Sequence, residues 1–278
     1  MKVAIVGGGA AGFFAGLSVK KHHSNADVFI LEKSSKLLSK VKISGGGRCN
    51  VTHACFKASQ LAKYYPRGSK ELKKAFSVFN VNHTIAWFKE RGVDLKRESD
   101  NRMFPVTNTS NTIINCFLDE ARKHNLKIQK DTFVTRIAQE KRQVKLTIDG
   151  FDHLYDKVII ASGGTPKLEG LDWMKKIGHS IVSPLPSLFT FNMPNEGITA
   201  LQGLSVKNVI IRVQGTKLVQ EGPLLITHWG MSGPSVLKTS AWGARDLAKL
   251  GYDFKIQINW LGISNEDEVR KILNRHCY

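Results

Sequence analysis

The sequence lacks the features of a metal-binding or disulfide-stabilised protein. Its 278 residues include four cysteines, Cys49, Cys55, Cys116 and Cys277, and no two of them are spaced as CxxC. No histidine cluster accompanies them, so we expect neither a zinc site nor a disulfide framework, and no metal at all. Free thiols are typical of reducing compartments, which indicates a cytoplasmic protein.

Long hydrophobic runs are also missing. No stretch reaches the ~18 apolar residues that a membrane span needs, so we expect no membrane partner. The mostly apolar run from Val3 to Val19 follows Lys2 and has some likeness to a signal peptide. However, Gly7–Gly9 interrupt the run, and glycine is a poor helix former. Without a clean small-x-small cleavage site, we expect this run to belong to the fold.

Acidic residues are few: 23 Asp and Glu stand against 41 Lys and Arg, a net charge of +18. Such a charge permits contact with nucleic acid, an anionic surface or small anionic ligands, but it does not indicate a fold. Basic and aromatic residues alternate in one stretch, namely Lys57, Lys63, Tyr64, Tyr65, Arg67, Lys70, Lys73, Lys74 and Phe76.

This basic stretch has two interpretations. Charge combined with stacking would suit RNA, whereas a solvated helix face is the more ordinary explanation and the favoured one. No zinc knuckle, RNP1 pattern or KH-type clamp points to RNA recognition. Nucleic acid is therefore the less favoured partner.

The first thirty residues predict a β-α-β unit. Residues 2–6 read as a buried strand, 10–22 as a helix with a basic last turn, and 27–31 as a second strand. The unit predicts a parallel sheet and an α/β fold. Later strands are expected over 127–149, as an antiparallel pair, and over 157–161. Helices are expected over 70–91 and, from an N-cap at Ser110, over 110–125.

A glycine-rich fingerprint joins the first strand to the helix. Gly7, Gly9 and Gly12 fit G-x-G-x-x-G, and Glu32 ends the next strand 20 positions later. Gly7 allows the tight turn, Gly9 lets a pyrophosphate approach the backbone, and Gly12 lets the helix pack on the strand. The helix N-terminus favours phosphate, and Glu32 would accept hydrogen bonds from a ribose.

Two further glycine segments are candidate ligand sites. In the segment 44–50, SGGGRCN, Arg48 could pair with a phosphate and Asn50 offers a donor and an acceptor, although a flexible surface turn is the alternative. Cys49 is more simply a packed residue than a redox thiol. The segment Ala161–Gly164 follows a buried strand, where ligands bind in open α/β sheets, and a plain turn is the alternative.

The second half of the chain has a different sequence pattern, one of strands and turns. After the proline-rich stretch 184–194, residues 196–225 and 253–260 indicate strands, and 265–276 indicate a helix. His228 lies between two Gly-Pro steps, where it could act as an acid or base. A lone histidine is more often a structural hydrogen-bonding group, and we favour that interpretation.

Together these segments resemble a known family. VAIVGGGAAGFFAG, VKISGGGRCNVTH, NRMFPV, IIASGG and GPLLITHWGMSGPSVL occur in this order, and the chain is similar to the bacterial BaiN/HI0933-like, or aminoacetone-oxidase-like, FAD-binding proteins. The resemblance implies a Rossmann-like FAD-binding domain over 1–190, an inserted β-rich domain over 191–262 and the start of a helical insert over 263–278.

The resemblance also implies a set of cofactor contacts. Gly7, Gly9, Gly12 and Glu32 would hold the ADP half of FAD, and Val134 would contact adenine through its backbone. The remaining implied contacts are Ala10, Ala11, Lys33, Gly46, Gly47, Arg48, Cys49, Asn50, Ala161, Ser162, Gly163 and Gly164.

The function implied is an FAD-dependent oxidoreductase acting on an unidentified small molecule, with NAD(P)H as a possible electron donor. The family's C-terminal GE-x-x-D…GGYN-like motif is absent from this sequence, which predicts a truncated chain or a fragment. A flavin-binding protein without turnover is therefore an alternative. No catalytic side chain is identified.

Overall fold

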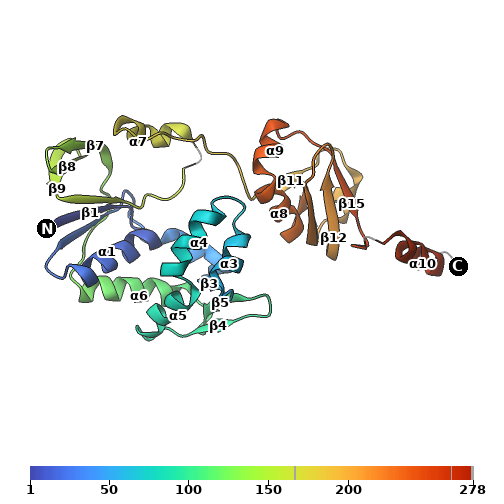
Figure 1. Ribbon diagram of the computed structural model, residues 1–278, viewed down its shortest axis with the longest axis horizontal. Coiled ribbons are helices and arrows are strands. Elements are labelled where there is room, and N and C mark those ends of the chain that lie inside the picture. The colour runs from blue at the N-terminus through green and yellow to red at the C-terminus, as the bar shows by residue number, and fades with distance from the viewer. Residues whose placement is uncertain (166, 264, 277–278) are drawn as a thin grey trace. The chain divides into compact units, whose positions relative to one another are not determined.

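The computed structural model describes residues 1–165, 167–263 and 265–276, which form two compact units, Met1–Val182 and Ser183–Tyr278 (Figure 1). Cys277 lies outside the described residues. Within the described ranges, every helix is too short or too polar to cross a membrane. The apolar run near the N-terminus forms a strand and a helix of the first unit.

A four-stranded parallel sheet is the centre of the first unit. Its order is β10-β1-β2-β6, with β1 at Lys2–Val6, β2 at Asp27–Leu31, β6 at Lys127–Gln129 and β10 at Lys157–Ile160. The predicted β-α-β unit is confirmed. The prediction that 127–149 forms only an antiparallel pair is wrong, because β6 runs parallel to β2. It follows a helix and so completes a second crossover.

Side chains alternate between the two faces of this sheet. Val3 and Ile5 of β1 pack in the core with two helices, and Ala4 packs in a second core with a three-stranded antiparallel sheet. The helices are α1 (Ala10–His22) and α6 (Ser110–Lys123), and the strands are β7 (Val134–Glu140), β8 (Gln143–Ile148) and β9 (Phe151–Tyr155) (Figure 1). Burying one large apolar side chain contributes about 1.5–3 kcal/mol, so these two cores hold the three layers together.

The single helix predicted over 70–91 is wrong. The chain forms α4 (Ser69–Val78) and α5 (Val81–Lys89), separated by Phe79 and Asn80 in extended conformations. The Oδ1 atom of Asn80 accepts from the backbone N–H of Asn82, and His83 Nδ1 accepts from the backbone N–H of Asn80. This reciprocal cap starts a new helix, because asparagine satisfies the unpaired first-turn amides better than it fits a helix interior.

Smaller elements complete the first unit. The N-cap of α6 is Thr109 rather than Ser110, whose hydroxyl instead donates to the carbonyl of Lys42. The glycine-rich sequence predicts a loop over 34–53, but this region contains α2, Ser39–Gly47, which is interrupted at Ser44–Gly46. The others are β3 (Thr52–His53), α3 (Ala58–Leu61), two 3₁₀ turns (Ala62–Tyr64 and Leu168–Leu171), β4 (Leu95–Arg97), β5 (Arg102–Pro105) and α7 (Asp172–Lys176).

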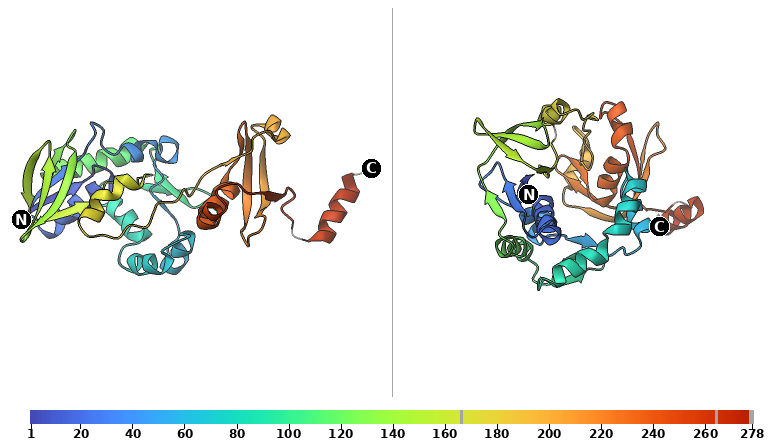
Figure 2. Two further views of the ribbon diagram at one scale, coloured as in Figure 1. Left: turned by 90° about the horizontal axis from the view of Figure 1, so that it is seen from above. Right: turned by 60° about the vertical axis from the view of Figure 1, so that its left-hand side comes forward.

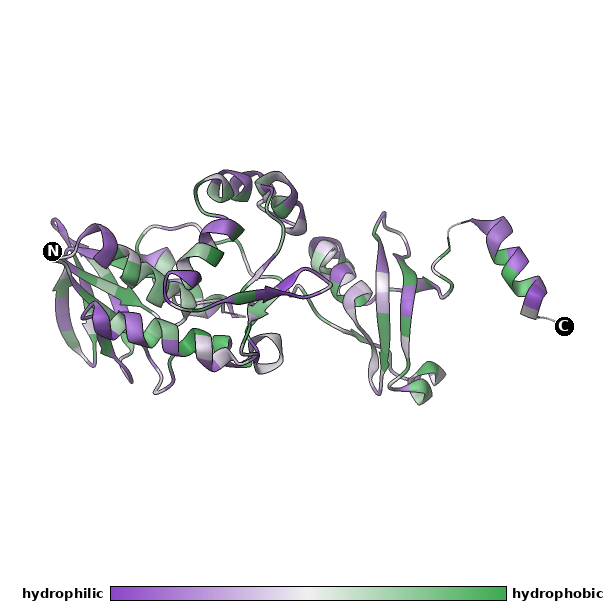
Figure 3. Ribbon diagram, turned by 90° about the horizontal axis from the view of Figure 1, so that it is seen from below, coloured by the Kyte–Doolittle hydropathy of each residue, from purple (hydrophilic) through white to green (hydrophobic). Residues whose placement is uncertain are grey.

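The second unit is a five-stranded antiparallel sheet with helices, as the β-rich pattern predicts. Its order is β11-β14-β13-β12-β15, and its strands carry both polar and apolar residues along their length (Figure 3). The apolar face packs with Val236 of α8. The elements are β11 (Phe191–Asn192), a 3₁₀ helix (Gly197–Leu201), β12 (Ser205–Val213), β13 (Val219–Thr227), β14 (Gly230–Ser232), α8 (Pro234–Trp242), α9 (Ala244–Lys249), β15 (Ile256–Asn259) and α10 (Glu266–His276).

Candidate functional site

The candidate site lies at the carboxyl edge of the parallel sheet. The connections that leave β1, β2 and β10 all begin there, and β1 has β2 on one side and β10 on the other. This is a topological switch point, where open α/β sheets bind ligands. Backbone hydrogen bonds join the three ends: the N–H of Gly7 donates to Leu31 O, and the N–H of Ala161 donates to Val6 O, both at 2.8 Å.

The three predicted glycines meet three different requirements. Gly7 has φ +117°, and a Cβ there would overlap the carbonyl oxygen of Ala161. A Cβ on Gly12 would overlap the carbonyl oxygen of Gly7, so only glycine lets α1 start this close to β1. Gly9 is the N-cap of α1, and among the residues that the structure describes no atom outside its own chain neighbours lies within 4 Å of its Cβ position. Its open side is therefore available to a ligand.

A fourth glycine, Gly8, is one that the sequence pattern does not single out. A Cβ on Gly8 would lie 2.8 Å from Leu37 Cδ2 and 2.9 Å from Glu32 Cβ. Its N–H donates to Glu32 Oε2 at 2.7 Å, and its carbonyl accepts from the N–H of Leu38 at 3.0 Å. The glycine loop is thus held between the end of β2 and the start of α2.

Glu32 is held in one orientation by three hydrogen bonds. In addition to the bond from Gly8, its Oε1 accepts from the N–H and the hydroxyl of Ser34, at 2.9 and 2.8 Å. Partial burial raises the pKa of Glu32, but these hydrogen bonds outweigh it, and the net pKa lies below the usual 4.5. A carboxylate has about four acceptor positions, so one remains for a ribose hydroxyl. The neighbouring Lys33 is exposed.

We expect Glu32→Gln to flatten the acid dependence of stability. Because the folded pKa is lowered, the ionised Glu32 stabilises the fold above about pH 4.5, and this stabilisation is lost as the pH falls through the lower folded pKa. Urea unfolding at pH 7 and pH 4 should therefore show a smaller pH difference in the variant. The exposed Asp131→Asn is the matched control and should keep the wild-type difference.

The SGGGRCN segment contains one structural glycine and two open ones. A Cβ on Gly45 would lie 2.7 Å from both the Asn50 nitrogen and Phe104 Cε1, whereas Gly46 and Gly47 have nothing within 4 Å. All three have positive φ. The segment therefore forms a left-handed turn at the end of α2, and Gly46 and Gly47 present open backbone.

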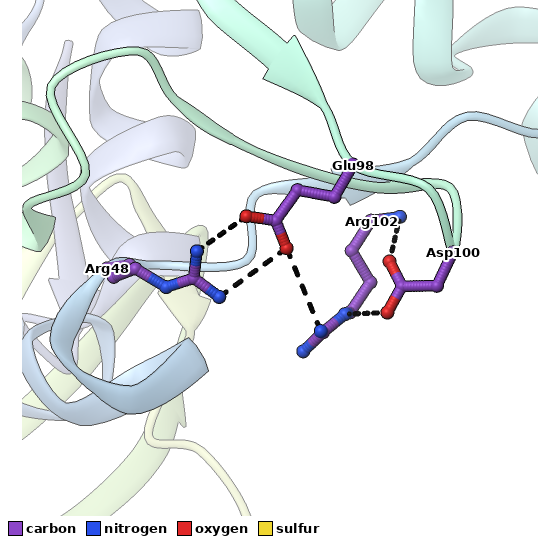
Figure 4. Close-up of polar contacts among 4 residues, drawn as sticks. All are labelled: Arg48, Glu98, Asp100 and Arg102. Atoms are coloured by element: carbon purple, nitrogen blue, oxygen red, sulfur yellow. Dashed lines mark hydrogen bonds and ion pairs between the residues drawn. The ribbon is translucent and has the colours of Figure 1, made fainter.

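Arg48, predicted to pair with a phosphate, has a partner within the protein. Its Nη1 donates to Glu98 Oε1 at 2.5 Å, and its guanidinium lies 4.0 Å from the centre of the Phe104 ring. Arg102 forms an ion pair with Asp100 (Figure 4). Its guanidinium also lies over the Phe104 ring, at 5.3 Å from the ring centre. A phosphate would have to compete with Glu98 for Arg48. The cluster ties the SGGGRCN turn to the β4–β5 hairpin.

Cys49 is a packed thiol, as predicted. Its side chain is buried in the core of the first unit. Burial raises the pKa of the Cys49 thiol, although a hydrogen bond with Ser44 partly opposes this. A raised pKa leaves little thiolate at neutral pH, so the residue is poorly suited to redox chemistry.

A cavity of about 570 Å³ opens beside the glycine loop. Ala10 and Ala11 of α1 and Asn50 of the SGGGRCN turn form part of its wall, and Lys40 is its one cationic residue. The rest of the lining is mainly apolar and comes from α1, α2, α5, α6 and the segments that follow α2 and precede α5; it comprises Phe14, Val41, Ser44, Cys49, Val51, Phe79, Thr84, Trp87, Phe88, Ile113 and Phe117. No sequence pattern signals this cavity, because its walls come from distant segments.

The remaining predicted residues lie on both units. Val134 begins β7 just after Thr132, whose N–H donates to Glu32 O at 2.9 Å, so Val134 is close to the end of β2. A Cβ on Gly163 would lie 3.5 Å from Lys40 Nζ, which places Ala161–Gly164 at the same edge. His228 belongs to the second unit, at an exposed turn, with its ring packed edge-on against Trp229.

These residues form a surface that suits a dinucleotide. The first-turn amides of α1 lie beside the open side of Gly9, and Glu32 stands at the end of β2. Comparison with known families decides the identity: the HI0933-like protein Rossmann domain matches residues 1–257. The chain belongs to the HI0933-like family. This is a family of FAD-dependent oxidoreductases with a Rossmann-type fold, and the resemblance read from the sequence is confirmed.

Curated relatives of this HI0933-like chain are longer than it is. The 3-dehydro-bile acid delta(4,6)-reductase of Clostridium scindens is 24% identical over 283 residues, covering 99% of this chain and 68% of the relative. The ribosomal RNA dihydrouridine synthase of Escherichia coli is 28% identical over 252 residues, covering 86% of this chain and 60% of the relative. The chain thus spans about two thirds of their length.

Among solved structures, the fold is similar to the open conformation of a flavocytochrome c3 fumarate reductase. The TM-score is 0.53 with 17% sequence identity, and the match covers 74% of this chain and 46% of that chain. At this identity the likeness concerns the fold alone.

Proposed function

We propose that this chain binds FAD at the carboxyl edge of the parallel sheet and contributes the cofactor-binding part of a reductase. The observation that carries the proposal is the open side of Gly9 at the N-terminus of α1, beside the fixed carboxylate of Glu32. When bound, FAD supplies the hydride-transfer chemistry, and the protein supplies binding, orientation and exclusion of water.

Each part of the site has a separate task in this proposal. The first-turn amides of α1 and its dipole stabilise the diphosphate. The free acceptor position of Glu32 accepts a ribose hydroxyl, and the backbone of Val134 contacts the adenine. Gly46 and Gly47 let the ligand approach the SGGGRCN turn, and the apolar cavity wall keeps water from the reacting part of the cofactor.

The proposed reaction is reduction of an unsaturated substrate with NAD(P)H as the donor. The names of the curated relatives support this direction, because a delta(4,6)-reductase and a dihydrouridine synthase are both named as enzymes whose products carry added hydrogen. The substrate is an unidentified unsaturated compound, and no side chain of the described residues is assigned as its proton donor.

A visible absorption spectrum tests the proposal directly. The purified chain is incubated with FAD, desalted and titrated anaerobically with NADH and NADPH. We expect a retained flavin band that bleaches with one of the two donors. A retained band that neither donor bleaches would favour the binding-only alternative, and complete loss of flavin on desalting would contradict the proposed site.

A further inference from the structure

A basic element stands out on the surface of the first unit. We use this name for residues 56–79, which include α3, the 3₁₀ turn and α4. It contains six cationic side chains and one carboxylate, Glu71, which gives it a net charge of +5. All six cations are exposed, namely Lys57, Lys63, Arg67, Lys70, Lys73 and Lys74.

The lysines of α4 are not used in packing the fold. Leu72 and Phe76 lie four residues apart on one face of the helix and are half-buried. Lys70, Lys73 and Lys74 have the i, i+3, i+4 spacing of one helix face, and this is the exposed face. Within the described part of the chain, the salt bridges found involve none of the element's five lysines. Their charge is therefore open to an external anion.

Aromatic rings are exposed beside this charge. Tyr64 is 58% exposed, Tyr65 43% and Phe56 47%. Neighbouring rings hold the two tyrosines: Tyr64 lies 5.0 Å from His53, and Tyr65 lies 5.6 Å from Phe76, between ring centroids. Rings that are exposed yet supported from behind offer a flat face to a stacking partner with little loss of side-chain freedom.

From the sequence alone, a solvated helix face is the favoured interpretation of this stretch. The two tyrosines favour a different interpretation, because they are exposed beside the lysines and supported by neighbouring rings. A membrane surface fits less well than RNA, since Phe76 of α4 packs on the protein and is not available to lipid. Cations interleaved with open ring faces are the pattern that binds single-stranded nucleic acid.

We propose that the basic element binds single-stranded RNA. The phosphates contact Lys70, Lys73 and Lys74, and unpaired bases stack on Tyr64 and Tyr65. Phe79, which follows α4 directly, is 40% exposed and lies on the wall of the cavity together with Asn50. The basic element therefore ends at the wall of the cavity, where RNA would be the substrate; only this last step rests on the proposed function.

Salt-dependent binding of a labelled oligouridine of about 12 nucleotides tests the proposal, read by fluorescence anisotropy. The logarithm of the affinity should fall with the logarithm of salt concentration with a slope of about −3.5 for about five phosphate contacts. The triple variant Lys70→Glu, Lys73→Glu, Lys74→Glu should bind at least tenfold more weakly and lower the slope by about 2. The double variant Tyr64→Ala, Tyr65→Ala should weaken binding about tenfold or more with its slope unchanged.

A second triple variant controls for net charge. Lys21→Glu, Lys141→Glu and Arg142→Glu change the charge equally on exposed residues of the last turn of α1 and of the β7–β8 turn, outside the basic element. The sheet of β7, β8 and β9 lies away from α3 and α4 (Figures 1 and 2). This variant should bind the RNA nearly as the wild type does. Circular dichroism confirms that each variant is folded.

Three outcomes would overturn the proposal. The first is no RNA binding by the wild type at low salt, and the second is an equal loss of RNA affinity in the two triple variants. The third is an α4 triple variant that keeps its RNA affinity but no longer binds phosphatidylglycerol vesicles. Flavin retention is measured on the same samples. A wild-type chain that binds RNA without retaining flavin would contradict the proposed function but would still support the RNA-binding surface.

Discussion

Gly12→Ala is expected to destabilise the first unit by about 3 kcal/mol or more. In an ordinary helix interior this substitution stabilises by up to about 1 kcal/mol, because alanine is the better helix former. Here the new methyl group would overlap the carbonyl oxygen of Gly7, a backbone atom of a loop whose own N–H is bonded to β2. Overpacking against backbone costs about 1–3 kcal/mol and occasionally more, so the steric effect exceeds the helix propensity.

Urea unfolding followed by circular dichroism measures the effect of Gly12→Ala. Gly9→Ala in the same loop is the comparison, because no protein atom lies within 4 Å of its Cβ position. A Gly12→Ala protein as stable as the wild type would mean that α1 and the glycine loop are not packed as the structure has them. Flavin binding should be lost together with stability.

Gly9→Ala is expected to weaken FAD binding at least tenfold while changing the free energy of unfolding by less than about 1 kcal/mol. Gly9 has φ −89° and ψ −175°, which alanine adopts without strain. The methyl group would instead occupy the space through which a diphosphate approaches the first-turn amides of α1. Equilibrium titration with FAD, followed by flavin fluorescence, gives the affinity.

The matched control for Gly9→Ala is Gly197→Ala in the second unit. Its Cβ position is equally free of neighbours, and it has no positive φ. This variant should bind FAD as the wild type does. Equal affinity of Gly9→Ala and the wild type would show that the diphosphate does not approach this glycine, and the candidate site would have to be placed elsewhere.

The sequence by itself was sufficient for the β1-α1-β2 unit and its glycine loop. These predictions depend on contacts between residues close in the chain: strand residues of one run, a helix with basic residues in its last turn, and glycines where the backbone must turn. Cys49 as a packed residue was also predicted correctly, from the absence of a nearby second thiol. The β-rich character of the second unit was also predicted from its sequence, which indicates strands over 196–225 and 253–260.

Other features needed the tertiary structure. The break between α4 and α5 depends on one asparagine, whose capping bonds outweigh a helical pattern that continues on both sides. The strand β6 joins the parallel sheet because α6 returns the chain beside β2. Arg48 and Glu98 pair across 50 residues, and no periodic pattern links them.

The candidate site also has features that the sequence predicts and features that only the tertiary structure shows. The positions of Gly7, Gly9, Gly12 and Glu32 follow from local spacing, because a strand, a tight turn and a helix fix their geometry within one unit. The packing around Gly8, the partner of Arg48 and the walls of the cavity arise from segments far apart in the chain. Local conformational preferences act between near neighbours and can be read along the chain, whereas packing and ion pairing depend on which distant surfaces meet, and only the folded structure decides that.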